Sequence, residues 1–218
     1  MILNYPRFHW DIVQGTDEWF DIKAGKLSAS TAHDLMINGK GEGGFGSGAI
    51  TQLARVVEER LTGKRQEGGF SGNWATEWGH TWEPVAREEF ELRNFLKVRE
   101  VGVIEKSSCI VASPDGLVPE IEEGLEIKCF PKNHIGVVET GSWDKKITTQ
   151  CLFNLWVSGY KKWHLVFFHP NFPDETKYLH YEILPDEEVF KIFEERCKTF
   201  NDLVDARVKA IKEEANHG

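Results

Sequence analysis

Three short strand patterns follow one another between residues 100 and 130, and helical patterns lie on both sides of them. Residues 100–106 alternate apolar and polar side chains, whereas residues 109–112 and 124–130 are short and mostly apolar. Strands this short and this close in sequence are expected to pair as a meander. Such a sheet buries its apolar surface only if helices cover it. The segment therefore predicts a sheet core with helices packed around it.

The rest of the chain supplies the helices and two more strands. Pro84 lies inside the second helical segment, which must kink or begin afresh there. The order of elements predicts an α/β (α+β mixed) fold with a central mixed β-sheet flanked by helices. The segments are helices at 50–61, 74–94, 144–158 and 186–212, and strands at 163–168 and 178–184.

Composition excludes several classes of protein. Forty per cent of the 218 residues are hydrophobic, with 8 Trp and 14 Phe, which excludes a disordered chain. No uncharged apolar run of about 18 residues occurs, and the first residues lack the form of a signal peptide. We therefore expect a cytoplasmic protein with no membrane partner. A single domain should span residues 1–218, with a motif-bearing core at roughly 14–184 and a C-terminal helix at 186–212.

Neither the cysteines nor the glycine-rich segment has the motif of a metal or phosphate site. Cys109, Cys129, Cys151 and Cys197 form no CxxC pair, whereas zinc and iron–sulfur sites usually use such pairs. We expect four reduced thiols. Segment 39–48 contains six glycines but lacks the GK[ST] ending of a phosphate-binding loop, so it is predicted to be a mobile loop.

The sharpest chemical feature is Asp115, followed after ten intervening residues by Glu126-Ile127-Lys128. Asp115 lies in a predicted turn, and Glu126 and Lys128 lie two apart on the next strand, which places both side chains on one face. A hard divalent cation prefers such oxygen ligands, and the backbone carbonyl of Ile127 would add a third. Lys128 would lie beside the metal, where it can orient water or offset phosphate charge. The set suits attack of activated water on a phosphodiester.

The same spacing also arises by chance. In that alternative, Glu126 and Lys128 are an ordinary ion pair on a solvated strand edge. The apolar neighbours Leu125, Ile127 and Cys129 favour a buried strand instead. Charged side chains are seldom fully buried without partners, so this strand favours the functional interpretation.

Further short motifs occur in order along roughly residues 14–160. They are Gln14-Gly15-Thr16-Asp17-Glu18-Trp19, Gly25-Lys26-Leu27-Ser28-Ala29-Ser30, Trp78-Gly79 with Glu83 and Ala86-Arg87, Ser113-Pro114-Asp115-Gly116-Leu117, Leu125-Glu126-Ile127-Lys128-Cys129, and Gln150 with Trp156-Val157. Together they resemble the phage lambda exonuclease family, also described as YqaJ-like viral recombinases, of the PD-(D/E)xK nuclease superfamily. The resemblance implies a restriction-endonuclease-like core.

The resemblance also implies roles for particular residues. Asp115 and Glu126 are similar to the metal-binding carboxylates, Lys128 to the catalytic lysine, and Glu83 to a further acidic residue that helps to hold the metals. Mg²⁺ or Mn²⁺ is implied, with two ions per active site. From the residues alone, the favoured interpretation of Glu83 is an exposed carboxylate near a helix start, where the helix dipole stabilises it.

A second site is implied for the 5′-phosphate of DNA. Lys23, Ser28 and Ser30 supply the cation and hydroxyl donors that a terminal phosphate needs. By resemblance, Ser113 and Gln150 join them. Either Ser28 or Ser30 is alternatively an N-cap of the following helix. The family has arginine where this chain has Lys23, and lysine lacks the bidentate fork, so a less strict demand for a 5′-phosphate is expected.

The resemblance implies a metal-dependent 5′→3′ exonuclease that degrades one strand of linear double-stranded DNA. It leaves 3′ single-stranded tails for a single-strand annealing protein in phage-type recombination, and the family enzyme is a trimer. Three alternatives stay open: a RecB- or Cas4-like nuclease, a restriction-type endonuclease, and a catalytically silent DNA-binding module of the same fold.

Net charge bears on the choice of partner. A formal charge of -9 argues mildly against nucleic acid. However, six lysines lie in or near the motifs, and bound divalent cations would change the local sign. We expect a basic groove on an acidic body. The lysines are Lys23, Lys26, Lys128, Lys132, Lys145 and Lys146.

Overall fold

Two four-stranded sheets form the framework of the protein, and the chain passes from one to the other near Pro114. The computed structural model describes residues 2–66 and 74–217. The first sheet has the order β1 (Ile2–His9), β3 (Val103–Ser107), β4 (Ile110–Ala112) and β2 (Leu27–Ser28). The second has the order β5 (Gly116–Val118), β6 (Glu123–Lys128), β7 (Lys162–Phe168) and β8 (Tyr178–Ile183).

Both sheets are mixed, which confirms the predicted fold class. β2 pairs with β4 and β6 with β7 in parallel, whereas the other pairs are antiparallel. The predicted single meander is wrong, because its strands are divided between the sheets. Pro114 lies at the division, and its missing N–H cannot continue a ladder. β1, β2 and β5 lie outside the predicted strands; β2 and β5, with two and three residues, are too short to show a period.

Seven α-helices are described, and the four predicted ones are present. α4 runs through Pro84 without a second start. α6 is buried on most sides, including Cys151, Phe153 and Leu155. The helices are α1 (Asp17–Lys23), α2 (Ala32–Met36), α3 (Ser47–Thr62), α4 (Trp74–Asn94), α5 (His134–Thr140), α6 (Lys145–Ser158) and α7 (Glu187–His217).

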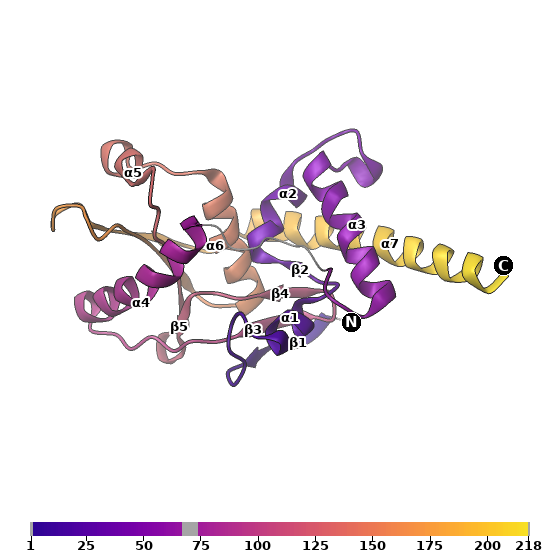
Figure 1. Ribbon diagram of the computed structural model, residues 1–218, viewed down its shortest axis with the longest axis horizontal. Helices are drawn as coiled ribbons and strands as arrows, with labels where there is room; N and C mark the ends of the chain where they lie inside the picture. The colour runs from indigo at the N-terminus through magenta and orange to yellow at the C-terminus, as the bar shows by residue number, and fades with distance from the viewer. Residues whose placement is uncertain (1, 67–73, 218) are drawn as a thin grey trace.

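The arrangement of helices places α6 at the centre. Figure 1 shows α4 and α5 toward one end of the molecule, α2 and α3 toward the other, and α6 between them. α7 packs its first half against the core through Phe193, Cys197 and Phe200, and its last turns project beyond the body (Figure 1). None of the described helices has the length and apolar character needed to cross a membrane.

The glycine-rich segment 39–48 packs against α7, which the prediction of a loop did not anticipate. A 3₁₀ turn at Glu42–Gly44 is possible because Gly43 adopts φ 64 and Gly44 φ 73. Phe45 is 1% exposed and packs edge-on against Phe200. Arg207 also donates to Glu42 at 2.6 Å. The glycines therefore shape a packed turn.

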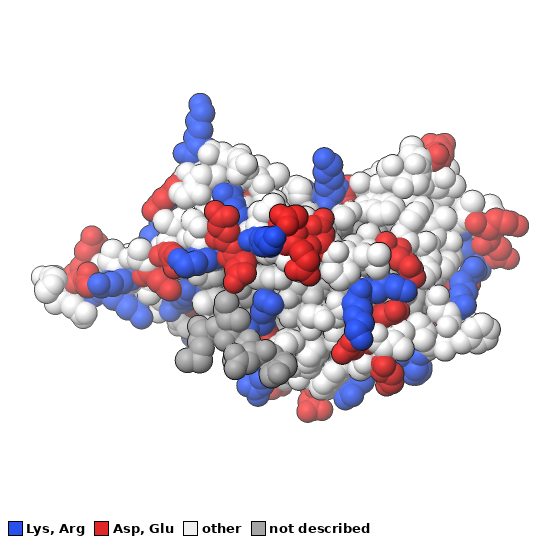
Figure 2. Space-filling model, turned by 180° about the vertical axis from the view of Figure 1, so that it is seen from behind, with Lys and Arg blue, Asp and Glu red and all other residues white. Residues whose placement is uncertain are grey.

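The charged surface bears on the expectation of a basic groove on an acidic body. On the face shown in Figure 2, acidic and basic side chains are interspersed over the part that the structure describes, so no single sign dominates that face.

Cys109, Cys129, Cys151 and Cys197 are free thiols, as predicted, and all except Cys109 are buried.

Gly124 tests the contact between β6 and β7. A Cβ built on Gly124 would lie 2.2 Å from Cζ3 of Trp163, which is fully buried on the neighbouring strand. We expect Gly124→Ala to lower the free energy of unfolding by about 1–3 kcal/mol in denaturant titration, because the ring must shift. The control is Gly136→Ala in α5, where nothing lies within 4 Å and the change should be neutral or stabilising. Unchanged stability of Gly124→Ala would contradict this packing.

Candidate active site

Asp115 and the strand β6 form the centre of the site. Asp115 lies at the bend between β4 and β5, and its Oδ2 accepts a hydrogen bond from the amide of Ile127 at 2.6 Å. This bond spans from the bend to β6, so it holds the Asp115 carboxylate beside the strand that carries Glu126 and Lys128. The predicted proximity of these three residues is therefore present in the structure.

Glu126 is almost completely buried, at 1% exposure, and three donors hold it. Lys128 Nζ and Gln150 Nε2 each donate to its Oε1 at 2.6 Å, and Asn154 Nδ2 donates to Oε2 at 3.1 Å. The contact with Lys128 follows from the two-residue period of β6. Gln150 and Asn154 are one turn apart on α6, which places both side chains on the same face of that helix.

α4 brings the third carboxylate from the other side. Arg87 Nη2 donates to Oε1 of Glu83 at 2.6 Å, and Arg87 Nε donates to the backbone carbonyl of Asp115 at 3.2 Å. Arg87 therefore ties α4 to the bend. Glu83, Asp115, Arg87 and His80 line one pocket of about 650 Å³. Glu83 is thus part of the site and is not the freely exposed carboxylate of the alternative interpretation.

Burial and neighbouring charges shift the pKa values of the carboxylates and of Lys128 at this site. Burial, and then the neighbouring Asp115, raise the pKa of Glu83 to about 8 and that of Glu126 to about 7. Burial also raises the pKa of Asp115. Burial alone would lower the pKa of Lys128, but Glu126 and Asp115 outweigh it and raise that pKa. Lys128 is therefore an ammonium, which donates hydrogen bonds and does not act as a base.

Residues 2–66 and 74–217 contain no ready cage of three or more His, Cys, Asp or Glu side chains around one point. The reason lies in the partners already described. Glu83 is turned toward Arg87, Glu126 toward Lys128, and Asp115 toward the Ile127 amide. Asp115 raises the pKa of both Glu83 and Glu126, yet all three carboxylates are held by protein donors.

A second pocket, of about 330 Å³, collects cations. Its lining includes Lys23, Lys26, Ser28, Ser30, Arg55 and Arg65. Lys23 Nζ lies 3.7 Å from the centroid of the Trp19 ring. Burial, and then the charges of Arg55 and Arg65, lower the pKa of Lys23 to about 7. Arg55 pairs with Glu59, which also lines the pocket, and Lys26 pairs with Glu105, so these two cations are compensated by carboxylates.

Ser28 and Ser30 point their hydroxyls toward each other, 3.1 Å apart. Their predicted role as helix N-caps is wrong. Ser28 and Thr31 occupy the N-cap positions of the 3₁₀ turn Ala29–Thr31 and of α2, and neither makes a side-chain cap. Ser28 instead bonds to Ser30, which leaves the remaining capacity of both hydroxyls facing the pocket.

The other two residues of the predicted phosphate set lie elsewhere in the site. Ser113 Oγ accepts from Trp19 Nε1 at 3.0 Å, behind the ring on which Lys23 rests. Gln150 donates to Glu126 and accepts from Lys128 at 3.2 Å. Gln150 therefore belongs to the carboxylate centre in this structure. Ser30, by contrast, lines both the pocket around Lys23 and the pocket that contains Glu83 and Asp115.

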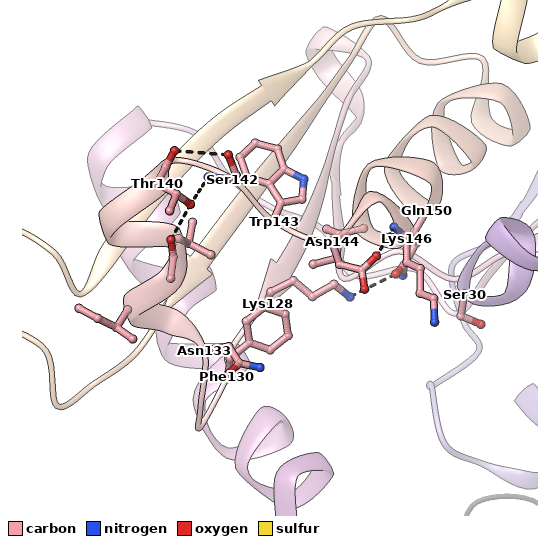
Figure 3. Close-up of a pocket in the computed structure, with 14 residues that line it drawn as sticks. Ser30, Lys128, Phe130, Asn133, Thr140, Ser142, Trp143, Asp144, Lys146 and Gln150 are labelled. Carbon is pink, nitrogen blue, oxygen red and sulfur yellow. Dashed lines mark hydrogen bonds between the residues drawn. The ribbon is translucent and has the colours of Figure 1, made fainter.

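A third pocket, of about 770 Å³, opens on the other side of Lys128 (Figure 3). Residues from β6, α5 and the start of α6 line it, and Ser30 lies at its edge. Three pockets of different character therefore meet at Ser30. No local pattern in the sequence indicates this arrangement, because α5 has only seven residues and no clear apolar period.

Asn154 and Arg87 are the site residues to which no role was assigned from the sequence. Asn154 was not singled out, and Arg87 appeared only in a motif. The single hint was polarity within an otherwise apolar helix, because Asn154 is fully buried in α6. A buried amide requires a partner, and here that partner is Glu126.

Asn154→Asp tests the importance of this amide. The substitution removes a donor to Glu126 and adds a second buried negative charge beside it. We expect the free energy of unfolding to fall by about 3 kcal/mol in chemical denaturation. Asn171→Asp, at an exposed position, is the control and should change stability by less than about 0.5 kcal/mol. A similar small effect for both variants would show that Glu126 does not depend on Asn154.

Solved structures similar to this chain share the whole architecture. An alkaline exonuclease, LHK-Exo, from Laribacter hongkongensis is 27% identical, with a TM-score of 0.83 over 93% of this chain and 99% of that chain. A structure of LHK-Exo in complex with dAMP matches equally well. A phage related exonuclease from Haemophilus somnus 129PT shares the fold, at 15% identity and a TM-score of 0.68 over 85% of this chain and 96% of that chain. No curated protein matches the chain.

The family assignment comes from the sequence. The family model described as a YqaJ-like viral recombinase domain matches residues 18–161, which include Lys23, Glu83, Asp115, Lys128 and Gln150. The match covers more than half of the chain and agrees with the resemblance inferred from the motifs. The chain belongs to the family of YqaJ-like viral recombinase domains.

Proposed function

We propose that this protein is a metal-dependent 5′→3′ exonuclease that degrades one strand of linear double-stranded DNA and leaves 3′ single-stranded tails. One observation carries the proposal: the Lys128 ammonium lies against the buried Glu126 in a site shared with Asp115 and Glu83. The overall similarity to LHK-Exo, an alkaline exonuclease at 27% identity, supports the same class of reaction.

The donor set fits divalent metal ions. The carboxylates of Asp115, Glu126 and Glu83 carry buried negative charge that raises the pKa of two of them toward neutrality, and a cation would relieve it. With the carbonyl of Ile127, they would hold Mg²⁺ or Mn²⁺, two ions per site. When bound, such ions supply Lewis-acid stabilisation of phosphate charge and activate water for attack. Glu83 and Glu126 would exchange their protein donors for the metals.

Protein side chains supply the rest of the chemistry. Lys128 stays protonated, so its role is to orient the attacking water and to offset charge on the phosphate that is cleaved. Gln150 fixes Lys128 through its own carbonyl oxygen. The cationic pocket around Lys23 would hold the terminal 5′-phosphate, with hydroxyls from Ser28 and Ser30.

Biological partners follow from the family resemblance. Double-stranded DNA ends are the substrate, and the 3′ tails would pass to a single-strand annealing protein during phage-type recombination. We also propose a homo-oligomer, with a trimer as the family precedent. A RecB- or Cas4-like enzyme with an iron–sulfur cluster is less well supported, because Cys129, Cys151 and Cys197 are buried free thiols distributed over separate elements.

Linear and closed circular DNA distinguish the candidate activities. With Mg²⁺, the protein should release nucleotides from end-labelled linear duplex, leave covalently closed circles intact, and lose activity when the metal is chelated. Lys128→Ala and Asp115→Ala should each lower the rate by about 100-fold or more, because each removes a group that stabilises the transition state. Lys198→Ala, a 76% exposed position on α7, is the matched control.

Other outcomes of this assay identify the alternatives. Cleavage of closed circles would indicate a restriction-type endonuclease. Binding without cleavage would indicate a silent DNA-binding module. Full activity of both Lys128→Ala and Asp115→Ala would falsify the mechanism.

Lys23 should set the preference for phosphorylated ends. Lys23→Ala should lower the rate ratio of 5′-phosphorylated to 5′-hydroxyl duplex. Because the pKa of Lys23 is about 7, the ratio in the natural protein should decline as the lysine deprotonates between about pH 6 and about pH 8. Lys23→Arg should keep the ratio constant over this range, since arginine stays charged. A ratio that is unchanged in Lys23→Ala would remove Lys23 from the phosphate site.

A further inference from the structure

The pocket beside Lys128 is not used by any step above. Its volume of about 770 Å³ lies within the range of small-molecule sites. In Figure 3, Trp143 lies above the Lys128 side chain, Phe130 and Asn133 lie below it, and Lys146 and Ser30 lie to its right. The pocket is therefore open directly onto the residues that act on the phosphodiester.

Its walls are aromatic and rigid. Trp143 is fixed by ring contacts with Phe167 at 5.4 Å and Tyr181 at 4.6 Å, and its Nε1 donates to Thr148 Oγ1 at 2.9 Å. Phe130 also packs on Phe167, at 5.9 Å between ring centroids. Val137 and Ile147 complete an apolar lining. This part of the lining suits a flat apolar ligand, whereas Lys128, Lys146 and Gln150 make the rest of the lining polar.

The three pockets differ in chemistry and meet at Ser30. One is cationic around Lys23, one contains the carboxylates Glu83 and Asp115, and one combines aromatic walls with Lys128 and Lys146. A nucleotide at the 5′ end of a strand likewise has three parts: a terminal phosphate, a scissile phosphate on its 3′ side, and a base. Each part matches one pocket.

We propose that the aromatic pocket beside Lys128 binds the base of the 5′-terminal nucleotide, with Phe130 and Trp143 as its aromatic walls. This inference rests on the proposed function. Stacking on an aromatic ring accepts every base, because each base has a π-face. That tolerance is required of an enzyme that removes successive nucleotides of any sequence.

Asn133 and Lys146 are among the polar side chains that line the pocket. Asn133 adopts φ 72 at the start of α5, and its amide offers one donor and one acceptor to the edge of a base. A single amide that contacts the edge of a base discriminates weakly between the four bases, which agrees with a site that accepts any nucleotide. The Lys146 ammonium lies beside Ser30 in Figure 3, on the side where the sugar and phosphate would lie.

The test compares two ligands that differ only in the base. Binding of dAMP and of 2-deoxyribose 5-phosphate is measured by calorimetry on the full chain with Mg²⁺. In the natural protein, dAMP should bind about tenfold tighter or more, which corresponds to the stacking of one base. Phe130→Ala should remove most of this difference and leave the affinity for 2-deoxyribose 5-phosphate unchanged.

Three variants keep the result interpretable. Phe130→Tyr should retain the preference for dAMP. Ile135→Trp fills the pocket from a 50% exposed position, so it should abolish the preference without disturbing the core even if Phe130→Ala unfolds. Leu184→Ala, 61% exposed and outside the pocket, should behave as the natural protein.

The outcomes separate this inference from the proposed function. Equal affinities for the two ligands in the natural protein would overturn the base pocket, even if linear duplex is hydrolysed. A preference for dAMP that survives both Phe130→Ala and Ile135→Trp would place the base elsewhere and also overturn it. A preference that both variants abolish supports the pocket, and it does so even if no hydrolysis of duplex is detected, in which case the exonuclease proposal alone fails.

Discussion

The structure depends on how a fully buried carboxylate is compensated. Glu126 lies on a central strand at 1% exposure, and burial of an uncompensated charge would cost several kcal/mol. Lys128 supplies the opposite charge from the same strand, and Gln150 and Asn154 supply two neutral donors from α6. The position of α6 against the sheet is therefore set by polar contacts as well as by its apolar surface. Any metal that binds here must compete with these donors.

α6 connects the site to the core of the protein. Gln150 and Asn154 reach Glu126 from one face of the helix, while Phe153 and Trp156 pack against Phe193 of α7 from another. A helix that is buried on most sides cannot move without disturbing both α7 and the sheet. The proposed catalytic groups consequently rest on rigid elements, and Ser30, in the 3₁₀ turn Ala29–Thr31 before α2, lines all three pockets.

The division into two sheets creates the site. The chain leaves β4 of the first sheet, turns at Ser113-Pro114-Asp115, and enters β5 of the second sheet. At such a junction the backbone ladder is interrupted, so Asp115 can accept the amide of Ile127 through its side chain. Next to this junction, α4 brings Glu83 to the pocket that contains Asp115, and α5 lines the pocket beside Lys128.

Local patterns in the sequence determined the long helices, the strands β6 and β7, and the shared face of Glu126 and Lys128. Each follows from a short-range period of 3.6 or 2 residues. Only the tertiary structure decided the contacts between Asn154 and Glu126 and between Arg87 and Asp115, the pairing of Ser28 with Ser30 in place of capping, and the three pockets. These features join residues from separate elements, or elements as short as α5 and β5, and no local period encodes such pairings.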